Sequence, residues 1–255
     1  MSIKLSWIGG ATWVLETHGL RIACDPCLCA QETVQDYGFF KSRRLEGPAL
    51  GPGDLQGVEV WLLTHHHEDH LDAEGLSRLA AGASIICPSR LSALLRKRGL
   101  DSTPLHWGHR TVLERGPVTL EIRAVPAIHA RNRILGALVG NGNGYVVAMQ
   151  KAGRACSLYV TGDDVFSPRR ATRFLPPKLD LVIANAGAAH VGRGLLGRLV
   201  GRITNGNADL ELIEKTLRPA VVIPVHWGTF EHYLEVPPPA FRRLTPGGSI
   251  ELPLL

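Results

Sequence analysis

The chain has 255 residues, and its 28 Lys and Arg exceed its 23 Asp and Glu by five, giving a net charge of +5. With 45% hydrophobic and 20% charged residues, the composition excludes a disordered chain, which needs low hydrophobicity and high net charge. We see no secretory signal and no continuous apolar run of membrane-spanning length, so we expect a cytoplasmic protein without a transmembrane segment. The small, scattered positive charge is compatible with a small-molecule substrate, including an anionic one, and is too weak to favour nucleic acid.

In the first part of the chain, apolar periodicity predicts strands separated by Gly-containing turns. The expected strands cover residues 3–7, 12–16, 20–24 and 58–63. Residues 31–57 are rich in Gly and Pro and are predicted as a loop, either a flap over a site or a surface excursion.

The second part of the chain mixes strands with helices. Strands are expected at residues 118–125, 145–149, 157–161, 179–184 and 221–225, and helices at 88–98 and 207–217. Asn207 is the expected N-cap of the second helix, and Pro219 follows its end. Because no Gly-rich linker divides the chain, we expect one α/β domain over residues 1–255 with mixed sheets.

Three of the five cysteines, Cys24, Cys27 and Cys29, lie close together in the sequence. A second Cys or His pair at zinc-finger spacing does not follow them. Since cysteine is often a small buried residue, we interpret these three as structural.

The segment from Thr64 to Asp72 carries the strongest chemical signal. It contains the pattern His65-x-His67-x-Asp69-His70 directly after a predicted buried strand. Imidazole and carboxylate are common ligands of zinc and similar ions, and strand ends are where α/β proteins place their sites. The ordered pattern favours a metal site over an accidental His tract.

This pattern resembles the signature of the metallo-β-lactamase superfamily. Three further residues match the ligands that this family places after strands, namely His129, Asp163 and His226. The resemblance extends from Trp7 to about Phe230. It implies a four-layer αββα sandwich with mixed sheets and a metal site at one edge.

Less specific features resemble the branch that contains ascorbate-phosphate lactonase and N-acylphosphatidylethanolamine phospholipase D. They are Trp7–Thr12, Cys24-Asp25-Pro26, Pro126–His129 and His226–Phe230. Two positions depart from that branch: Asp164 stands where Thr is usual, and residues 185–190 differ from the lactonase pattern. The departures leave the substrate open.

The resemblance implies a dinuclear centre. His65, His67 and His129 would hold the first ion, Asp69, His70 and His226 the second, and Asp163 would bridge both. Two divalent ions are expected, Zn²⁺ first, with Mn²⁺ or Fe²⁺ as alternatives. A hydroxide shared by the ions would be the nucleophile, and Asp69 and Asp163 would be the catalytic carboxylates.

Other residues are assigned by position. Asp25 and Asp72 are candidates to orient metal-bound histidines, and Asn185, His190 and Arg193 are candidate substrate contacts near a strand end. His66 and Glu68 alternate with the ligands and are expected to point away. We interpret His106, His109 and His232 as surface or packing residues.

The resulting hypothesis is a metal-dependent hydrolase acting on a small ester, lactone or phosphoester. A phosphodiesterase acting on lipid or nucleic acid and a non-catalytic metal-binding protein are the alternatives. Family nucleases usually carry an extra domain for which this chain has little length. Di-iron oxidoreductases on this fold typically replace the residue at His67 with Glu.

Overall fold

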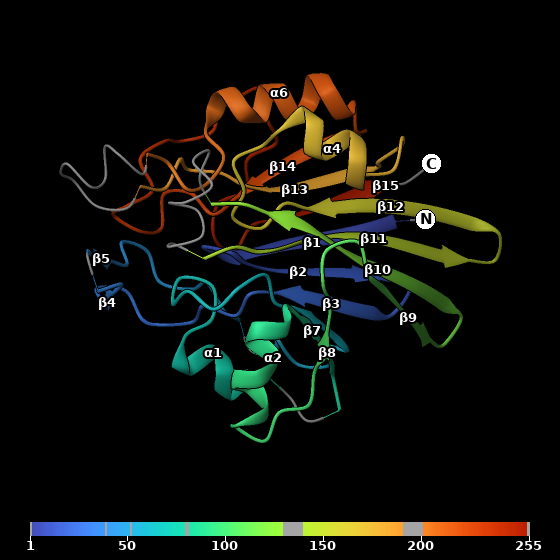
Figure 1. Cartoon of the computed structure of the whole chain (residues 1–255), viewed down its shortest axis with the longest axis horizontal. Helices are drawn as coiled ribbons and strands as arrows, with labels where there is room; N and C mark the ends of the chain where they lie inside the picture. Colours follow the sequence, from blue (N-terminus) through green and yellow to red (C-terminus); the bar gives the residue numbers. More distant parts are fainter. Residues whose placement is uncertain are drawn as a thin grey trace.

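A computed structural model describes residues 2–38, 40–51, 53–79, 82–129, 140–190 and 201–253. Two large sheets stack face to face at its centre (Figure 1). Within the described residues, the first sheet consists of β15 (Ser249–Pro253), β1 (Ser2–Gly9), β2 (Thr12–Thr17), β3 (Leu20–Cys24), β6 (Val60–Leu62), β7 (Ser84–Cys87) and β8 (Thr103–Pro104), in that spatial order. Its strands from β15 to β3 pair antiparallel, and those from β3 to β8 pair parallel.

The second sheet is also mixed. Its order is β14 (Val221–Val225), β13 (Leu181–Asn185), β12 (Arg154–Val160), β11 (Gly142–Lys151), β10 (Val118–Ala127) and β9 (Arg110–Arg115). The pairs β12–β13 and β13–β14 are parallel, and β11 runs antiparallel to both β10 and β12. Consequently β10, β12, β13 and β14 all end at the same edge of this sheet.

Apolar side chains explain the layering. Alternating residues of both sheets, such as Leu5, Leu62, Leu120 and Val147, are fully buried between the sheets. The outer face of the first sheet is covered by α1 (Ala73–Arg78) and α2 (Ser89–Arg96), and that of the second by α4 (Pro168–Phe174) and α6 (Asn207–Leu217) (Figure 1). Burial of both faces of each sheet stabilises this arrangement. The expected four-layer αββα sandwich is therefore confirmed.

The expected strands are all present, with ends shifted by a few residues. The helix expected over 207–217 is α6, but its N-cap is Gly206 rather than Asn207. The Asp209 carboxylate accepts a hydrogen bond from the Gly206 amide at 2.9 Å, and this contact fixes the helix start one residue earlier. The short helices α1 and α4 and the edge strands β9 and β15 were not predicted, because their brief apolar patterns resemble those of loops. Among the described residues, no helix is long and apolar enough to cross a membrane.

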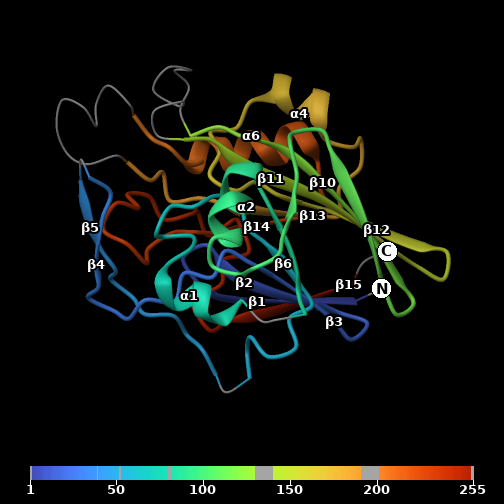
Figure 2. The same ribbon diagram turned by 60° about the horizontal axis from the view of Figure 1, so that its bottom comes forward.

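Residues 31–57 are not loop throughout. Within this range, β4 (Val34–Asp36) and β5 (Lys41–Arg43) form a two-stranded hairpin that projects beside the sandwich (Figure 2). The Arg43 guanidinium pairs with the Glu231 carboxylate at 2.6 Å, and the Leu45 amide donates to the Thr229 carbonyl at 2.8 Å. These contacts attach the hairpin to the segment that follows β14.

Candidate metal centre

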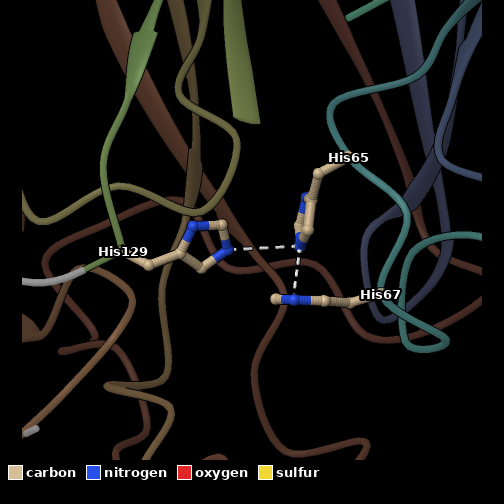
Figure 3. Close-up of side chains that lie close together, drawn as sticks. All are labelled: His65, His67 and His129. Atoms are coloured by element: carbon tan, nitrogen blue, oxygen red, sulfur yellow. Dashed lines mark hydrogen bonds between the residues drawn. The ribbon is translucent and has the colours of Figure 1, made fainter. Parts of the chain in front are cut away.

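Three histidines from two sheets converge on one point. His65 and His67 follow β6 in the first sheet, and His129 follows β10 in the second. His65 Nε2 lies 3.0 Å from His67 Nδ1 and 3.3 Å from His129 Nε2 (Figure 3). Nitrogens this close on three separate rings surround a space of the size a small cation occupies.

A second set of donors lies next to the first. Asp69, His70, Asp163 and His226 each contribute an atom to a group whose members lie within 4.8 Å of one another, and all four residues are buried. Asp163 follows β12 and His226 follows β14, so parallel strand ends deliver both residues to the same edge.

Asp163 faces both sets. Its Oδ1 lies 3.1 Å from His70 Nε2 and 3.6 Å from His226 Nε2. Its Oδ2 lies 3.8 Å from His129 Nε2 and 3.9 Å from His65 Nε2. One carboxylate therefore presents a different oxygen to each group of histidines.

The backbone is strained where two of these segments turn inward. His226 has φ of 61° and Asp25 has φ of 39°, values that are uncommon outside Gly, although His and Asp adopt them more often than most residues. The His226 amide donates to the Gly10 carbonyl at 2.9 Å, and this contact joins β14 to the turn between β1 and β2. Such strain is characteristic of functional sites, where the surrounding packing maintains it.

Asp25 supports the site from behind, as the sequence suggested. Its Oδ2 accepts hydrogen bonds from His70 Nδ1 at 2.7 Å and from Thr64 Oγ1 at 2.5 Å, while Oδ1 accepts from the Thr64 amide at 2.7 Å. A carboxylate at Nδ1 leaves the Nε2 lone pair of His70 facing Asp163. Asn185, predicted as a substrate contact, instead donates from Nδ2 to Asp163 Oδ1 at 2.9 Å.

The ionisation of these groups suits metal binding. Burial lowers the pKa of His65 well below its usual value, and burial lowers that of His129 to about 3. Although burial opposes ionisation of Asp69 and Asp163, hydrogen bonds and positive charge from surrounding histidines hold both carboxyl pKa values well below the usual range. Burial likewise disfavours charging of His70, but Asp163 and Asp25 raise its pKa overall. A coordinating imidazole must be neutral, so the lowered pKa values of His65 and His129 and the ionised carboxylates suit metal ligands, whereas His70 would release a proton on binding an ion.

Unpartnered polar atoms test whether the residues fit an ion. Asp69 Oδ1 and His70 Nε2 are buried and form no well-aligned hydrogen bond among the described residues, although His70 Nε2 lies 3.1 Å from Asp163 Oδ1. Buried polar groups are normally satisfied, so these atoms point to a missing partner. Since His65, His67 and His129 turn ring nitrogens toward each other, a cation between them would satisfy all three. The donor set therefore fits divalent ions.

Two site residues carried no recognised motif. His232 was interpreted as a surface or packing residue, yet it is buried, and its Nε2 lies 3.2 Å from Asp69 Oδ2 while its Nδ1 lies 2.6 Å from Ser42 Oγ. The neighbouring Tyr233 hydroxyl lies 2.8 Å from His226 Nε2 and donates to Asp69 Oδ2 at 3.2 Å. The only sequence feature that linked these two residues to the site was their position, six and seven residues after the candidate ligand His226.

A cavity of about 560 Å³ opens beside the centre. It is lined by Phe40, Lys41, Leu45, His190, Glu231, His232 and Leu234. On the hairpin, the rings of Tyr37 and Phe40 stack with their centroids 4.5 Å apart. Both ring centroids lie within 6 Å of the centroid of the His232 ring. His232 thus lies between the cavity and Asp69. His190 also lines the cavity, and its contact with a substrate stays a prediction.

Four further residues were assigned from the sequence, namely Asp72, His66, Glu68 and Arg193. Asp72 caps α1 and accepts from the Leu28 and Cys29 amides, and among the described residues it forms no hydrogen bond with a candidate ligand. His66 and Glu68 are exposed. Arg193 lies outside the described residues.

The chain is similar to known proteins over most of its length. The profile of the β-lactamase superfamily domain matches residues 21–227. The chain is 24% identical to an N-acyl-phosphatidylethanolamine-hydrolyzing phospholipase D from Caenorhabditis elegans, over 90% of this chain and 66% of the relative, so it spans just under two thirds of that relative's length. It is also 24% identical to a UPF0173 metal-dependent hydrolase from Pyrococcus furiosus, over 98% of this chain and 100% of the relative.

Among solved structures, the fold is similar to that of an isothiocyanate hydrolase from Delia radicum gut bacteria. The TM-score is 0.76 at 23% identity, covering 97% of this chain and 98% of the other. The expectation of a metal-dependent hydrolase of this family is confirmed. The family profile matches most of the length of the chain, and the chain therefore belongs to the metallo-β-lactamase superfamily.

Proposed function

We propose that the chain is a dinuclear metal hydrolase that cleaves a small ester, lactone or phosphoester. The observation that carries this proposal is the position of Asp163, whose two oxygens face two separate groups of histidines. A carboxylate placed between two sets of imidazoles suits a pair of divalent ions. His65, His67 and His129 would hold one ion, and Asp69, His70 and His226 the other, with Asp163 between them.

When bound, two such ions supply Lewis acidity and make a water molecule acidic enough to act as a nucleophile near neutral pH. The protein's own groups perform the remaining tasks. Asp69 Oδ1 is unpaired among the described residues and can accept a proton from the attacking water. His232 and Tyr233 hold the other oxygen, Oδ2, and so fix the direction of that carboxylate. Asp25 and Asn185 fix His70 and Asp163.

The cavity beside the centre supports a small substrate with an apolar part. Its volume of about 560 Å³ lies in the range of sites for small molecules. Phe40, Leu45 and Leu234 supply apolar wall. Lys41 pairs with Asp36 at 3.0 Å, and Arg43 pairs with Glu231, so these lining charges already have partners. An ester or lactone with a short apolar group fits this lining, and a phosphoester of the same size is the second choice.

The similarity to the worm phospholipase keeps a lipid phosphodiesterase as an alternative function. A nucleic-acid phosphodiesterase remains the less favoured form, because the net charge of +5 is small for tracking a phosphate backbone. A non-catalytic metal-binding protein would show full metal occupancy without turnover on any of these substrates.

Metal content tests the centre directly. We would purify the untagged chain and measure Zn, Mn and Fe per chain for the unaltered protein and for Asp163→Asn. Asp180→Asn is the matched control, because Asp180 is also a buried carboxylate, but it lies just before β13 and accepts from the Ser157 amide of β12. We expect about two ions per chain, as in two-metal hydrolase sites, in the unaltered protein and in the control, and a sharp fall in Asp163→Asn.

Zinc is the expected metal. If the purified protein held mainly manganese or iron, the identity of the metal would be revised and the proposed dinuclear centre would stand. Less than half an ion per chain, with no uptake of added Zn²⁺ or Mn²⁺, would overturn the dinuclear centre. The loaded protein would then be tested on short-chain esters, lactones, phosphomonoesters, a phosphodiester and phospholipid vesicles. Turnover of the phospholipid vesicles alone would favour the lipid phosphodiesterase. Metal binding without turnover of any of these substrates would favour the non-catalytic metal-binding protein.

A further inference from the structure

A second cluster of reactive groups lies apart from the candidate metal centre. Cys27, Cys29 and Asp72 each place a donor atom within 4.8 Å of the others. Cys27 is fully buried and Cys29 is partly exposed, and both cysteines are free thiols. Among the described residues, the hydrogen bonds of these two thiols connect them to Gln35 and Arg44 and to none of the candidate metal ligands.

Arg44 determines the chemical character of this cluster. Its side chain is fully buried, and Nη1 lies 3.4 Å from Cys27 Sγ and 3.5 Å from Cys29 Sγ. The guanidinium also donates to the carbonyls of Cys27 and Glu46, both at 2.9 Å, and lies 5.3 Å from the Phe230 ring centroid. Within the described part of the chain, no carboxylate forms an ion pair with it, and Nη2 has no hydrogen-bond partner.

A buried guanidinium requires a nearby negative charge, because an uncompensated charge is costly to remove from water. Asp72 is the carboxylate of the cluster, but its oxygens accept from the amides of Leu28, Cys29 and Gly75 and form no ion pair with Arg44 among the described residues. The remaining acids are the two thiols. A second donor, Gln35 Nε2, lies 3.6 Å from Cys29 Sγ and 3.8 Å from Cys27 Sγ. Donors converging on sulfur stabilise a thiolate, and a cation already in this position disfavours a further metal ion.

The two thiols are not equivalent. The hydrogen bond from Cys27 and the contacts with Arg44 lower the pKa of Cys29 to about 7, against the effect of burial. Burial raises the pKa of Cys27 well above its usual value. The partly exposed sulfur is thus the nucleophile, and the buried sulfur beside it keeps its proton.

From this geometry we infer that Cys29 and Cys27 form a redox-active dithiol that reacts with hydroperoxides and closes to a disulfide. The Cys29 thiolate attacks one oxygen of the hydroperoxide, so that an S–O bond forms and the O–O bond breaks. The other oxygen leaves as water or an alcohol after taking a proton from solvent. Cys27 Sγ then attacks Cys29 Sγ, an S–S bond forms, and water leaves with the Cys27 proton. The two thiols lose two electrons in total and the peroxide gains them.

The test uses the whole reduced, zinc-loaded chain and hydrogen peroxide as the probe. Equimolar peroxide should remove two hydrogen atoms from the intact mass, and dithiothreitol should restore them. The tryptic peptide of residues 22–41 contains Cys24 as well, so Cys24→Ser is the matched control and should still lose two hydrogens. Cys27→Ser should stop at a sulfenic acid, which dimedone traps, and Cys29→Ser should not react at this peptide.

A second measurement needs no variant. Iodoacetamide should alkylate Cys29 in the folded chain with a midpoint near pH 7. At pH 6.5 its rate should exceed that of free cysteine about tenfold, because a far larger fraction is thiolate. Cys156, whose pKa burial raises to about 12, is the internal unreactive reference. A midpoint above pH 8.5, a disulfide formed equally in Cys29→Ser, or loss of one bound zinc in that variant would overturn the inference.

Discussion

The Asp25 carboxylate lies 2.7 Å from Nδ1 of His70, on the side of the ring opposite to Asp163. The two residues are 45 positions apart in sequence, and each follows a strand of the same sheet, β3 for Asp25 and β6 for His70. Because β3 and β6 are parallel neighbours, their ends meet at one edge. The contact fixes the ring plane and directs Nε2 into the candidate metal centre.

Removing this contact should weaken metal binding. We expect Asp25→Asn to lower Zn²⁺ affinity about 10- to 100-fold, the usual effect of losing a carboxylate behind a metal-bound histidine. Asp72→Asn is the control, since it removes a buried carboxylate that holds backbone amides. Titration against a chromophoric chelator gives both affinities. Equal affinities in the two variants would contradict the role assigned to Asp25.

Metal removal should destabilise the fold. The candidate ligands are buried and come from both sheets, so an ion would join the sheets together. Stripping with a chelator should lower the melting temperature, and Zn²⁺ at a thousand times its Kd should restore about 4 kcal/mol of unfolding free energy. Calorimetry measures the difference. If Zn²⁺ raised the melting temperature of Asp163→Asn equally, the stabilisation would come from another site.

The Tyr233 hydroxyl should matter for catalysis more than for folding. Tyr233→Phe keeps the packed ring but removes the hydrogen bond to Asp69 Oδ2. Because a hydrogen bond to a charged group is worth about 1.5–3 kcal/mol, we expect kcat to fall about tenfold or more. The zinc content should not change. Tyr159→Phe, a buried tyrosine in the cluster under α4 and α6, should retain full kcat, and a drop of equal size there would argue against the assignment.

The hairpin should influence substrate binding. Phe40→Ala removes a ring that stacks on Tyr37 and forms part of the cavity wall. We expect KM to rise several-fold for substrates with an apolar group and kcat to change little. Val34→Ala, on the same hairpin but 57% exposed, serves as the control. Steady-state kinetics on a short and a longer ester separate the two effects, and an unchanged KM would exclude the cavity as the binding site.

Gly75 should be intolerant of substitution. A Cβ at this position of α1 would lie 1.6 Å from the Pro26 carbonyl oxygen, which is far inside contact distance. Gly75→Ala must displace α1 or the turn after β3, so we expect a loss of about 2 kcal/mol or more of unfolding free energy. Ser77→Ala, exposed on the same helix, should change stability little. Urea unfolding of both variants checks this, and equal midpoints would show that α1 can shift without cost.

Several features followed from local sequence. Alternating apolar residues predicted the strands, because a sheet buried on one or both faces requires that pattern. The His65-x-His67-x-Asp69-His70 pattern identified a metal-type site, and the family resemblance indicated His129, Asp163 and His226 as its other members. Asp25 was proposed as a supporting residue from its position after a strand, and its contact with His70 agrees. Which of these groups hold metal remains a prediction.

Only the tertiary structure revealed His232 and Tyr233 beside Asp69, because no local pattern distinguishes them from packing residues. The same holds for Arg44, the second of two adjacent arginines, which is buried against two thiols seventeen and fifteen residues earlier. It also reassigned Asn185 from the substrate to Asp163. Sequence by itself determined the periodic elements and the chemical types at their ends. The folded arrangement decided which side chains meet, because such contacts depend on how the two sheets and the hairpin pack rather than on neighbours along the chain.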